Sequence, residues 1–506
     1  MEKFGYLRRK LGLKRVRDQD RKFILIMIDA LGYNTLKDVK NEYMPFLSKL
    51  VRNYNLTPYN VGIPSTTPYV QAGLFYNYDE IIPGFRVYDK KNRKRIVIGS
   101  MQGASFIEER LKKRSRGILY NGSSLGNVFS AGAKRTLFTF TGMQANSSIT
   151  NVRDVLSVVF VNPFSFFRVA YFSIKDFFVE VFENLRDNFK KKKGDFVNFS
   201  MFYPYFPFFR LGINAFTREV LTEAAILEMK RNVSRIGMTF HGYDWVSHYR
   251  GPRKKSSLSV LKEIDKKLEW LYKTARKEGY DFYVYSDHDI VPGLPFDKLY
   301  NQSLSEFITR VKEGKREVRD GMRDYIVYKL KYLHENFSLP LRAASGFLLK
   351  FFRVSKKRER IKEIEVHNSS CISHVYFSNF EKRLSLDEIE KYYPGIVNKL
   401  VNHEGVGVVI CKGKDGMNVF GDLSKYGDVV KLKKWLKKIY DMDYFGDLFI
   451  MGAIKNGKIV TFEDFHMGTH DGFGLEMHKG FFVSKKKYDF SDSDSVKVLH
   501  SIFKDY

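Results

Sequence analysis

The sequence is poor in cysteine. Its 506 residues include only Cys371 and Cys411, too few for the disulfide framework that holds many small secreted domains together. A composition of this kind favours a protein that works in a reducing compartment.

Long apolar runs are also missing. No window supplies the roughly 18 uninterrupted apolar residues that a membrane-spanning helix requires. Residues 1–22 are basic, but the apolar run that follows them, 23–28, is too short for a signal peptide and stops at Asp29. We therefore expect a cytoplasmic protein, with peripheral binding at the inner face of the membrane as an open alternative.

Acidic residues are outnumbered by basic ones. The chain has 57 Asp and Glu against 86 Lys and Arg, which gives a net charge of +29. An excess of this size attracts anions such as nucleic acid, anionic lipid or phosphorylated small molecules. A lysine-rich proteome would explain it equally well, so the charge does not choose among these readings.

Three short apolar runs share one pattern. Residues 23–28, 235–240 and 281–285 have the length and composition of buried strands, and polar residues follow each of them. Helices are expected at 41–52, roughly 216–232 and 255–277. Strands that alternate with helices predict an α/β fold with a mainly parallel central sheet flanked by helices. In such sheets, ligands bind beyond the carboxyl ends of the strands.

A chain of this length is expected to form a large core interrupted by insertions. One insertion, 151–215, is rich in Phe and Tyr and carries the Lys190–Lys193 run, and another, 306–366, is helical in pattern and strongly charged. The predicted divisions are a basic segment at 1–22, core at 23–150, the aromatic insertion at 151–215, core at 216–305, the charged insertion at 306–366 and core at 367–506.

Carboxylate and imidazole side chains follow the three predicted strands. Asp29 ends the first run, Asp244 and His248 come four residues apart after the second, and Asp287 and His288 follow the third. Residues four apart on a helix share one face, and oxygen and nitrogen donors placed in this way can bind a divalent cation. Each motif also has an ordinary explanation as a helix cap, a turn or an incidental surface pair.

Two further features could belong to the same site. Residues 64–68, Pro-Ser-Thr-Thr-Pro, precede an expected helix at 69–76, and free N–H groups at a helix start favour a phosphate or an alkoxide. Ordinary capping by Ser or Thr explains the same pattern. His470 lies in a loop with several glycines, where the backbone can approach another group closely, yet a single histidine is often only a polar surface or core residue.

In their order along the chain, these residues resemble the site of the alkaline phosphatase superfamily. The closer resemblance is to its type I phosphodiesterase/nucleotide pyrophosphatase branch. It is carried by the stretches IPSTTPYVQAGLFY, IPGFRVYDK, NGSSLGNVFS, FHGYDWVSHYRGP, YSDHD and GTHDGFG. The resemblance covers about 23–485 outside the two insertions.

The resemblance implies an alkaline-phosphatase-like core that binds two divalent cations. One cation would be held by Asp244, His248 and His470, and the other by Asp29, Asp287, His288 and the oxygen of the nucleophile. Thr66 is implied as that nucleophile because the family places it two residues before a proline, here Pro68. The mixed ligand set suits Zn²⁺, with Mn²⁺ as the alternative.

Two positions depart from the family pattern. Asp289 follows the Asp-His pair and Asp471 follows the last histidine, where the family usually has glycine. Each is expected to add negative charge near a cation site, which could alter the metal preference or repel a second phosphate.

The resemblance predicts a metal-dependent phosphoric ester hydrolase of the phosphodiesterase or nucleotide pyrophosphatase type, working through a phospho-threonine intermediate. Its substrate would be a phosphorylated small molecule or a lipid-linked phosphate. Alternatives are a phosphomonoesterase, a phosphotransferase or mutase of the same superfamily, or an inactive member that binds a membrane or polyanion.

The aromatic insertion has three readings. Its Phe, Tyr, Arg and Lys content resembles segments that lie in a membrane interface, and it equally fits a buried cap with solvated charges. Binding of single-stranded nucleic acid ranks last, since no dedicated motif accompanies the aromatic residues.

Overall fold

The computed structural model of the chain describes residues 21–144, 163–189, 206–313, 362–464, 466–491 and 495–506. Most of the predicted basic segment 1–22 and large parts of both predicted insertions lie outside the described residues. Among the described helices, none combines the length and the apolar character needed to cross a membrane.

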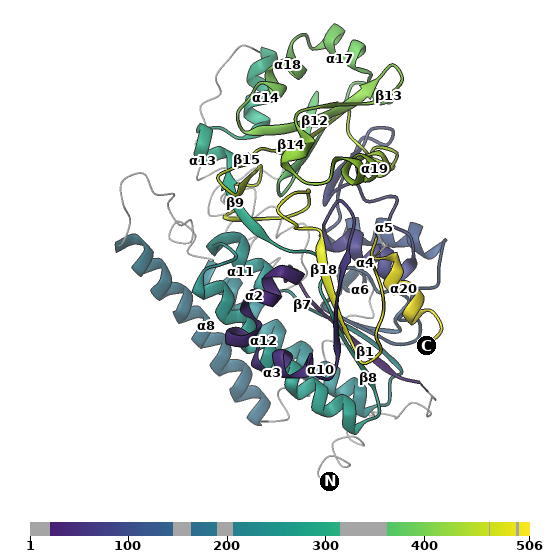
Figure 1. Cartoon of the computed structure of the whole chain (residues 1–506), viewed down its shortest axis with the longest axis vertical. Helices are drawn as coiled ribbons and strands as arrows, with labels where there is room; N and C mark the ends of the chain where they lie inside the picture. Colours follow the sequence, from purple (N-terminus) through teal and green to yellow (C-terminus); the bar gives the residue numbers. More distant parts are fainter. Residues whose placement is uncertain (1–20, 145–162, 190–205, 314–361, 465, 492–494) are drawn as a thin grey trace.

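A seven-stranded sheet forms the centre of the fold (Figure 1), with the strand order β2-β18-β8-β1-β7-β5-β6. The strands are β1 (Phe23–Ile28), β2 (Asn55–Asn60), β5 (Ser123–Leu125), β6 (Arg135–Leu137), β7 (Arg235–Phe240), β8 (Asp281–Tyr285) and β18 (Lys479–Ser484). β18 runs antiparallel to its neighbours β8 and β2, and the other pairs are parallel. The predicted α/β fold is confirmed, and β1, β7 and β8 have the predicted bounds.

Helices cover both faces of this sheet, which is why β1 is apolar at every position. Phe23, Leu25 and Met27 pack into one core, and the alternate residues of β1 pack into another. The helices of the first core include α4 (Thr67–Tyr76), α5 (Met101–Lys112) and α20 (Lys497–Phe503). Those of the second are α2 (Tyr33–Tyr43), α3 (Pro45–Leu50), α10 (Thr217–Lys230), α11 (Gly242–Arg250) and α12 (Lys255–Lys277).

The prediction of a single helix over 41–52 is wrong. The structure has two helices there, because α2 ends at Tyr43 and α3 begins at Pro45. Proline lacks a backbone N–H and disfavours helical conformation in the residue before it. Met44 accordingly leaves the helical region, with φ −136° and ψ 60°.

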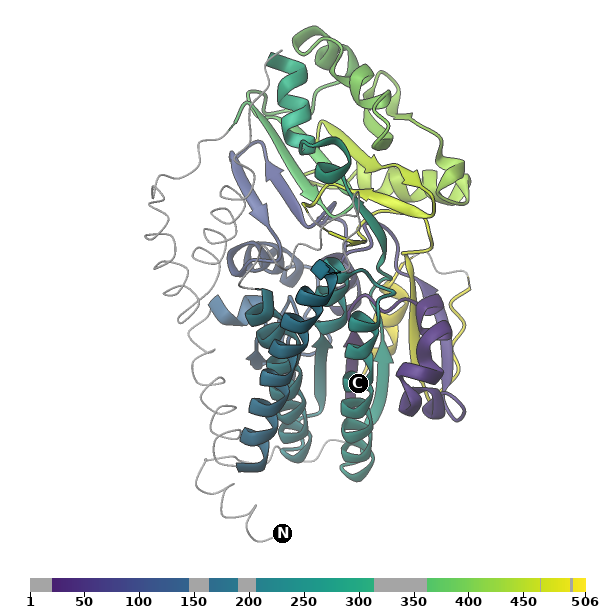
Figure 2. The ribbon, with the colours of Figure 1, turned by 90° about the vertical axis from the view of Figure 1, so that its left-hand side faces the viewer.

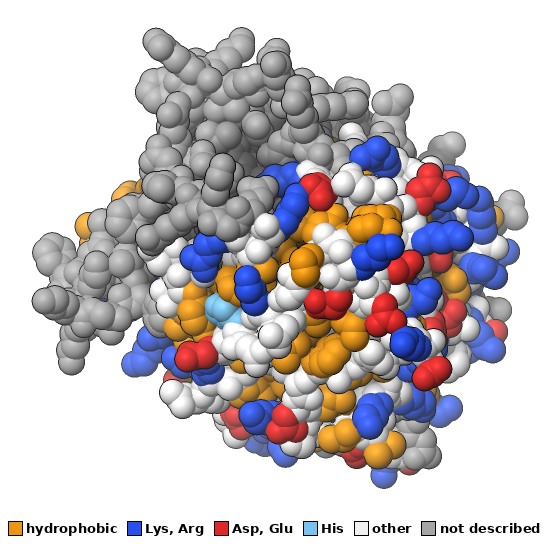
Figure 3. All heavy atoms as spheres, turned by 90° about the horizontal axis from the view of Figure 1, so that it is seen from above, with side chains coloured by type: hydrophobic (Ala, Val, Ile, Leu, Met, Phe, Trp, Pro, Cys, Tyr) orange, Lys and Arg blue, Asp and Glu red, His pale blue; other side chains and the backbone are white. Residues whose placement is uncertain are grey.

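A second, antiparallel sheet follows in the chain and lies at the upper end of Figure 1. Its strands are β10 (Ile364–Ser369), β11 (Ile372–Phe377), β12 (Val406–Gly413), β13 (Gly416–Phe420) and β14 (Leu448–Gly452). The helices near it are α13 (Phe296–Tyr300), α14 (Leu304–Glu313), α17 (Leu386–Tyr392), α18 (Ile396–Val401) and α19 (Val429–Tyr440). Figure 3 looks onto this end, where basic side chains are interspersed with acidic and apolar ones.

Two smaller sheets lie beside these. The hairpin of β3 (Arg86–Asp89) and β4 (Lys94–Val97) is one. The other contains β9 (Val291–Pro295), β15 (Ile454–Lys455), β16 (Lys458–Thr461) and β17 (Gly468–Thr469).

The described part of the aromatic insertion is helical. It consists of α8 (Pro163–Phe189), α9 (Phe206–Phe209) and the π-helical turn η2 (Arg210–Phe216). α8 packs on η2 and α10 and lies at the left edge of Figure 1. Of the charged insertion predicted at 306–366, α14 and the start of β10 are described, and 314–361 lie outside the described residues.

Candidate functional site

Three neighbouring strands, β8, β1 and β7, end at one edge of the central sheet. Asp29 directly follows β1, Asp287 comes two residues after β8, and α11 begins two residues after β7. Because parallel strands in register end together, the polar residues that follow them converge. α11 then places Asp244 and His248 one helical turn apart on the same face.

His470 also lies at this edge, although it comes nearly two hundred residues after His288 in the chain. β17 pairs antiparallel with β9, so that Thr469 lies opposite Val291 and Gly468 opposite Pro292. β9 begins shortly after His288, and this pairing therefore carries the next residue, His470, to the strand ends. The ring centroids of His470 and His288 are 4.1 Å apart and the rings are stacked.

Asp29, Asp287 and His288 form one group of ligand atoms, all within 4.8 Å of one another and all buried. His288 Nε2 lies 3.2 Å from Asp287 Oδ2 and 3.7 Å from Asp29 Oδ1. The backbone N–H groups of Ala30 and His288 donate to Asp287 Oδ1, at 3.0 and 3.1 Å. These bonds hold the Asp287 carboxylate and leave its Oδ2 facing the group.

The electrostatics of this group suit a cation. Burial and the neighbouring carboxylate of Asp287 raise the pKa of Asp29 well above its usual range. Burial lowers the pKa of His288, which favours a neutral imidazole able to coordinate a metal. A divalent cation would offset the repulsion between the carboxylates and accept all three donors.

Asp244, His248 and His470 form a second group of the same kind. The Nε2 atoms of His248 and His470 lie 3.0 Å apart. Asp244 Oδ1 is 3.3 Å from His248 Nε2 and 3.6 Å from His470 Nε2. His248 Nδ1 is 2.9 Å from the carbonyl oxygen of Gly468, so it donates there and leaves Nε2 free for a metal.

The donors of this second group also fit a cation. Asp244 Oδ1 is buried and has no hydrogen-bond partner within the described part of the chain. Burial opposes ionisation of Asp244, but His248 and His470 outweigh it and hold the pKa of that carboxyl below its usual range. One carboxylate and two imidazole nitrogens that face one another are the mixed oxygen and nitrogen set that Zn²⁺ and Mn²⁺ accept.

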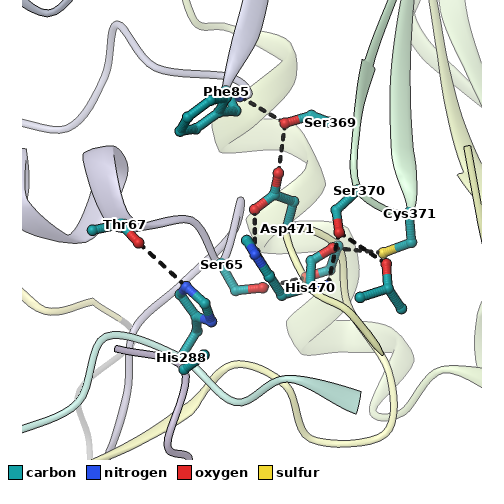
Figure 4. Close-up of polar contacts among 12 residues, drawn as sticks. Ser65, Thr67, Phe85, His288, Ser369, Ser370, Cys371, His470 and Asp471 are labelled. Carbon is teal, nitrogen blue, oxygen red and sulfur yellow. Dashed lines mark hydrogen bonds and ion pairs between the residues drawn. The ribbon is translucent and has the colours of Figure 1, made fainter. Parts of the chain in front are cut away.

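The two adjacent threonines differ in their surroundings. Thr67 Oγ1 donates to Asp287 Oδ2 at 2.7 Å and lies 3.4 Å from Asp29 Oδ1. It also lies 3.4 Å from His288 Nε2 (Figure 4). Thr66 is the N-cap residue of α4, and its buried hydroxyl has no hydrogen-bond partner among the described residues. The structure therefore brings the hydroxyl of Thr67 to the first ligand group, where the resemblance implied Thr66.

The two unexpected carboxylates do not both face the cation groups. Asp289 turns to the start of α2, where it accepts hydrogen bonds from Gly32 N at 3.2 Å and from Thr35 Oγ1 at 2.7 and 2.8 Å. A Cβ at Gly32 would lie 2.2 Å from that of Asp289, so glycine is required there. Burial raises the pKa of Asp289 to about 6. Hydrogen bonds to Asp289 thus connect the start of α2 to the segment after β8.

Asp471 contacts the His470 ring at Nδ1. Its Oδ1 lies 2.5 Å from His470 Nδ1, and Ser369 Oγ donates to its Oδ2 at 2.5 Å (Figure 4). Burial would lower the pKa of His470, but the Asp471 carboxylate outweighs it and raises that pKa to about 9. A carboxylate on Nδ1 orients the ring with Nε2 toward the metal and increases its basicity.

One residue of the site had no signal of its own in the sequence. His241 lies directly after β7, with Nδ1 2.6 Å from Asp29 Oδ2 and Nε2 2.5 Å from the carbonyl oxygen of Gly126. Burial opposes protonation of His241, but its hydrogen bond to Asp29 raises its pKa. Its place at the end of one of the three strands is the feature that could have identified it.

Comparisons with known proteins agree with this architecture. Residues 23–335 match the sequence model of the type I phosphodiesterase/nucleotide pyrophosphatase family. The solved structure of the alkaline phosphatase PafA is 12% identical, with a TM-score of 0.51 over 96% of this chain and 95% of that chain. No curated protein matches the sequence.

Two further solved structures are similar at lower TM-scores. Phosphonoacetate hydrolase from Sinorhizobium meliloti 1021 is 11% identical, with a TM-score of 0.47 over 96% of this chain and 95% of that chain. Murine ectonucleotide pyrophosphatase/phosphodiesterase 5 is 12% identical, with a TM-score of 0.46 over 95% of this chain and 94% of that chain. On its match over most of its length, the chain belongs to the type I phosphodiesterase/nucleotide pyrophosphatase family, phosphoester hydrolases of the alkaline phosphatase superfamily.

Proposed function

We propose that this protein hydrolyses phosphate diesters, with Thr67 as the nucleophile and one divalent cation bound by each of the two ligand groups. The observation that carries the proposal is the position of Thr67, whose hydroxyl lies 2.7 Å from Asp287 Oδ2 at the start of α4. Family membership supports the diester class of substrate. The donor sets favour Zn²⁺, with Mn²⁺ as the alternative.

The chemistry follows from this placement. Cations bound at such a site would supply Lewis acidity, which favours ionisation of a nearby hydroxyl and offsets charge on the reacting phosphate. Thr67 Oγ1, freed of its proton, attacks phosphorus, the bond to one ester oxygen breaks, and that oxygen leaves with a proton as the alcohol. Free N–H groups at the start of α4 favour the phosphate in this position.

A second step restores the enzyme. After the first step the phosphoryl group is bonded to Thr67 as a phospho-threonine that still carries one ester group. Water attacks phosphorus, the bond to Thr67 Oγ1 breaks, and the threonine hydroxyl and a phosphate monoester are released. Asp471 acts indirectly in both steps, since it orients the ligand His470.

A matched pair of substitutions tests the nucleophile. Valine has the shape of threonine without its hydroxyl, so Thr67→Val should lower kcat on bis-p-nitrophenyl phosphate by at least about a thousand-fold with bound metal unchanged. Thr66→Val removes a buried hydroxyl that makes no hydrogen bond within the described chain and should stay within about three-fold of the parent. The opposite pattern would assign the nucleophile to Thr66.

A substrate panel tests the diester preference. The metal-reconstituted protein should hydrolyse bis-p-nitrophenyl phosphate and a nucleotide p-nitrophenyl ester faster than p-nitrophenyl phosphate, and a chelator should stop all three reactions. Preference for the monoester would favour a phosphomonoesterase instead. No turnover by the metal-loaded protein on any of the three would contradict the proposal.

A further inference from the structure

α8 presents apolar side chains to solvent and polar side chains to the protein. The residues it buries include Ser165, Ser173, Asp176, Glu180 and Asn184. The residues it exposes include Phe164, Phe167, Tyr171, Ile174, Phe178 and Phe182. A surface helix in water has the reverse arrangement. The side of the molecule that carries α8 faces the viewer in Figure 2.

The polar face of α8 is bonded to the rest of the fold. Glu180 pairs with Arg210 of η2 at 2.9 Å and with Arg250 of α11. Asn214 donates to Asp176 at 2.5 Å, and Ser165 donates to a carboxylate of α10 at 2.8 Å. Turning the apolar face inward would leave these buried charges without partners, which costs several kcal/mol for each broken pair. The outward direction of the apolar face is therefore set by the protein itself.

The exposed side chains form one continuous band. Their spacing of three and four residues repeats along a helix of 27 residues, which is roughly 40 Å long. Of the thirteen large hydrophobic side chains that are exposed among the described residues, eight lie on α8. Single exposed apolar residues are normal on a soluble protein, but a band of this size marks a surface with an apolar partner.

Basic side chains border this band. Lys175 of α8 and Lys266 of α12 both approach Glu263, at 3.4 and 3.2 Å, and their side chains are 43% and 65% exposed. The whole chain carries a net charge of +29. An apolar band edged by lysines is complementary to a lipid surface with anionic headgroups.

We propose that α8 is a membrane-docking helix that lies in the plane of an anionic lipid bilayer. The aromatic and aliphatic side chains of its outer face enter the boundary between headgroups and acyl chains, and the bordering lysines contact lipid phosphates. A paired helix from a second copy is disfavoured, because most of the exposed large side chains of α8 are Phe or Tyr, which suit a lipid interface, whereas the seam of a coiled coil is built from Leu, Ile and Val. Docking does not depend on the hydrolytic activity proposed above.

Vesicle flotation with the full chain tests the proposal. The protein should float with vesicles of phosphatidylcholine mixed with phosphatidylglycerol at low salt, and less with phosphatidylcholine alone or at high salt. The triple variant Phe167→Gln, Ile174→Gln, Phe178→Gln should bind at least about ten-fold more weakly. A matched control, Tyr392→Gln with Val430→Gln, changes exposed apolar residues away from α8 and should bind like the parent. Unchanged thermal unfolding of the triple variant would show that it is folded.

Three outcomes would overturn the proposal. The first is no flotation of the parent protein with anionic vesicles at low salt, as expected if another segment of the chain covers the band. The second is equal binding by the parent and the triple variant. The third is a parent protein that sediments as a dimer and a triple variant that sediments as a monomer, which would assign the band to a second copy of the chain.

Discussion

Asp471 and Asp289 show how two similar residues next to ligand histidines can have different tasks. Asp471 contacts the ring of His470, whereas Asp289 accepts hydrogen bonds from Gly32 and Thr35 at the start of α2. Both had been expected to place negative charge near a cation. In the structure, one contacts the ring of a proposed ligand and the other holds the start of α2.

The two residues should therefore differ when each is replaced by asparagine. Asp471→Asn should weaken metal binding by about ten- to a hundred-fold, because the orienting carboxylate on His470 is lost. Asp289→Asn should keep the metal affinity within about three-fold and lower the free energy of unfolding by about 1–2 kcal/mol, since buried hydrogen bonds are lost. Competition with a chelating dye and denaturant unfolding measure the two quantities. Equal loss of metal affinity in both variants would contradict the distinction.

At the scale of elements, α11 is held in place by α8. Arg250, at the end of α11, is buried and pairs with Glu180 of α8. The same helix carries Asp244 and His248, so the insertion that contains α8 supports the position of two proposed ligands. A buried ion pair thus joins α8, the proposed membrane-docking helix, to α11, the helix that carries two proposed ligands.

Breaking this ion pair should be costly. Arg250→Met leaves Glu180 with one cation fewer in a buried place, and we expect the free energy of unfolding to fall by about 3 kcal/mol. Lys273→Met is the control, because Lys273 and Glu269 form an exposed pair on α12 that should contribute less than about 1 kcal/mol. Urea denaturation of both variants measures the difference. Similar small losses in the two would mean that the buried pair does not anchor α11.

At the scale of the whole molecule, the proposed cations join segments that are far apart in the chain. The six ligands come from the ends of β1 and β8, from α11 and from the loop after β17. Cations that bind only the folded arrangement stabilise it by mass action. With both proposed cations bound, the site would cross-link the central sheet and the C-terminal part of the chain.

Metal removal should consequently lower the Tm. At a free metal concentration about a hundred times the Kd, the stabilisation is about 2.7 kcal/mol per site, which corresponds to about 2–3 °C per site for a chain of this length. A chelator should remove this increment, and added Zn²⁺ or Mn²⁺ should restore it in scanning calorimetry. The double variant Asp244→Asn, Asp287→Asn should unfold at one temperature with or without chelator. A parent protein whose Tm is the same with and without chelator would contradict the two-cation proposal.

Local patterns along the chain predicted much of the fold. Continuous apolar runs identified β1, β7 and β8 with their bounds, because a strand covered on both faces has no polar position. The period of α12 identified that helix in full. The predicted helix over 41–52 failed because Pro45 disfavours the helical conformation at Met44, and this local effect overrides the apolar period.

The amino-acid sequence by itself determined the α/β class, the family and the order of the residues that form the two ligand groups, since these depend on local periodicity and on motifs read along the chain. Only the tertiary structure decided which of the adjacent threonines reaches the proposed ligands, because only the hydroxyl of Thr67 hydrogen-bonds to one of them in the described part of the chain. The same holds for Asp471, His241 and the outward apolar face of α8. The roles of His241 and α8 depend on contacts with residues distant in sequence, and the role of Asp471 depends on the direction in which its carboxylate turns, so no local pattern fixes them.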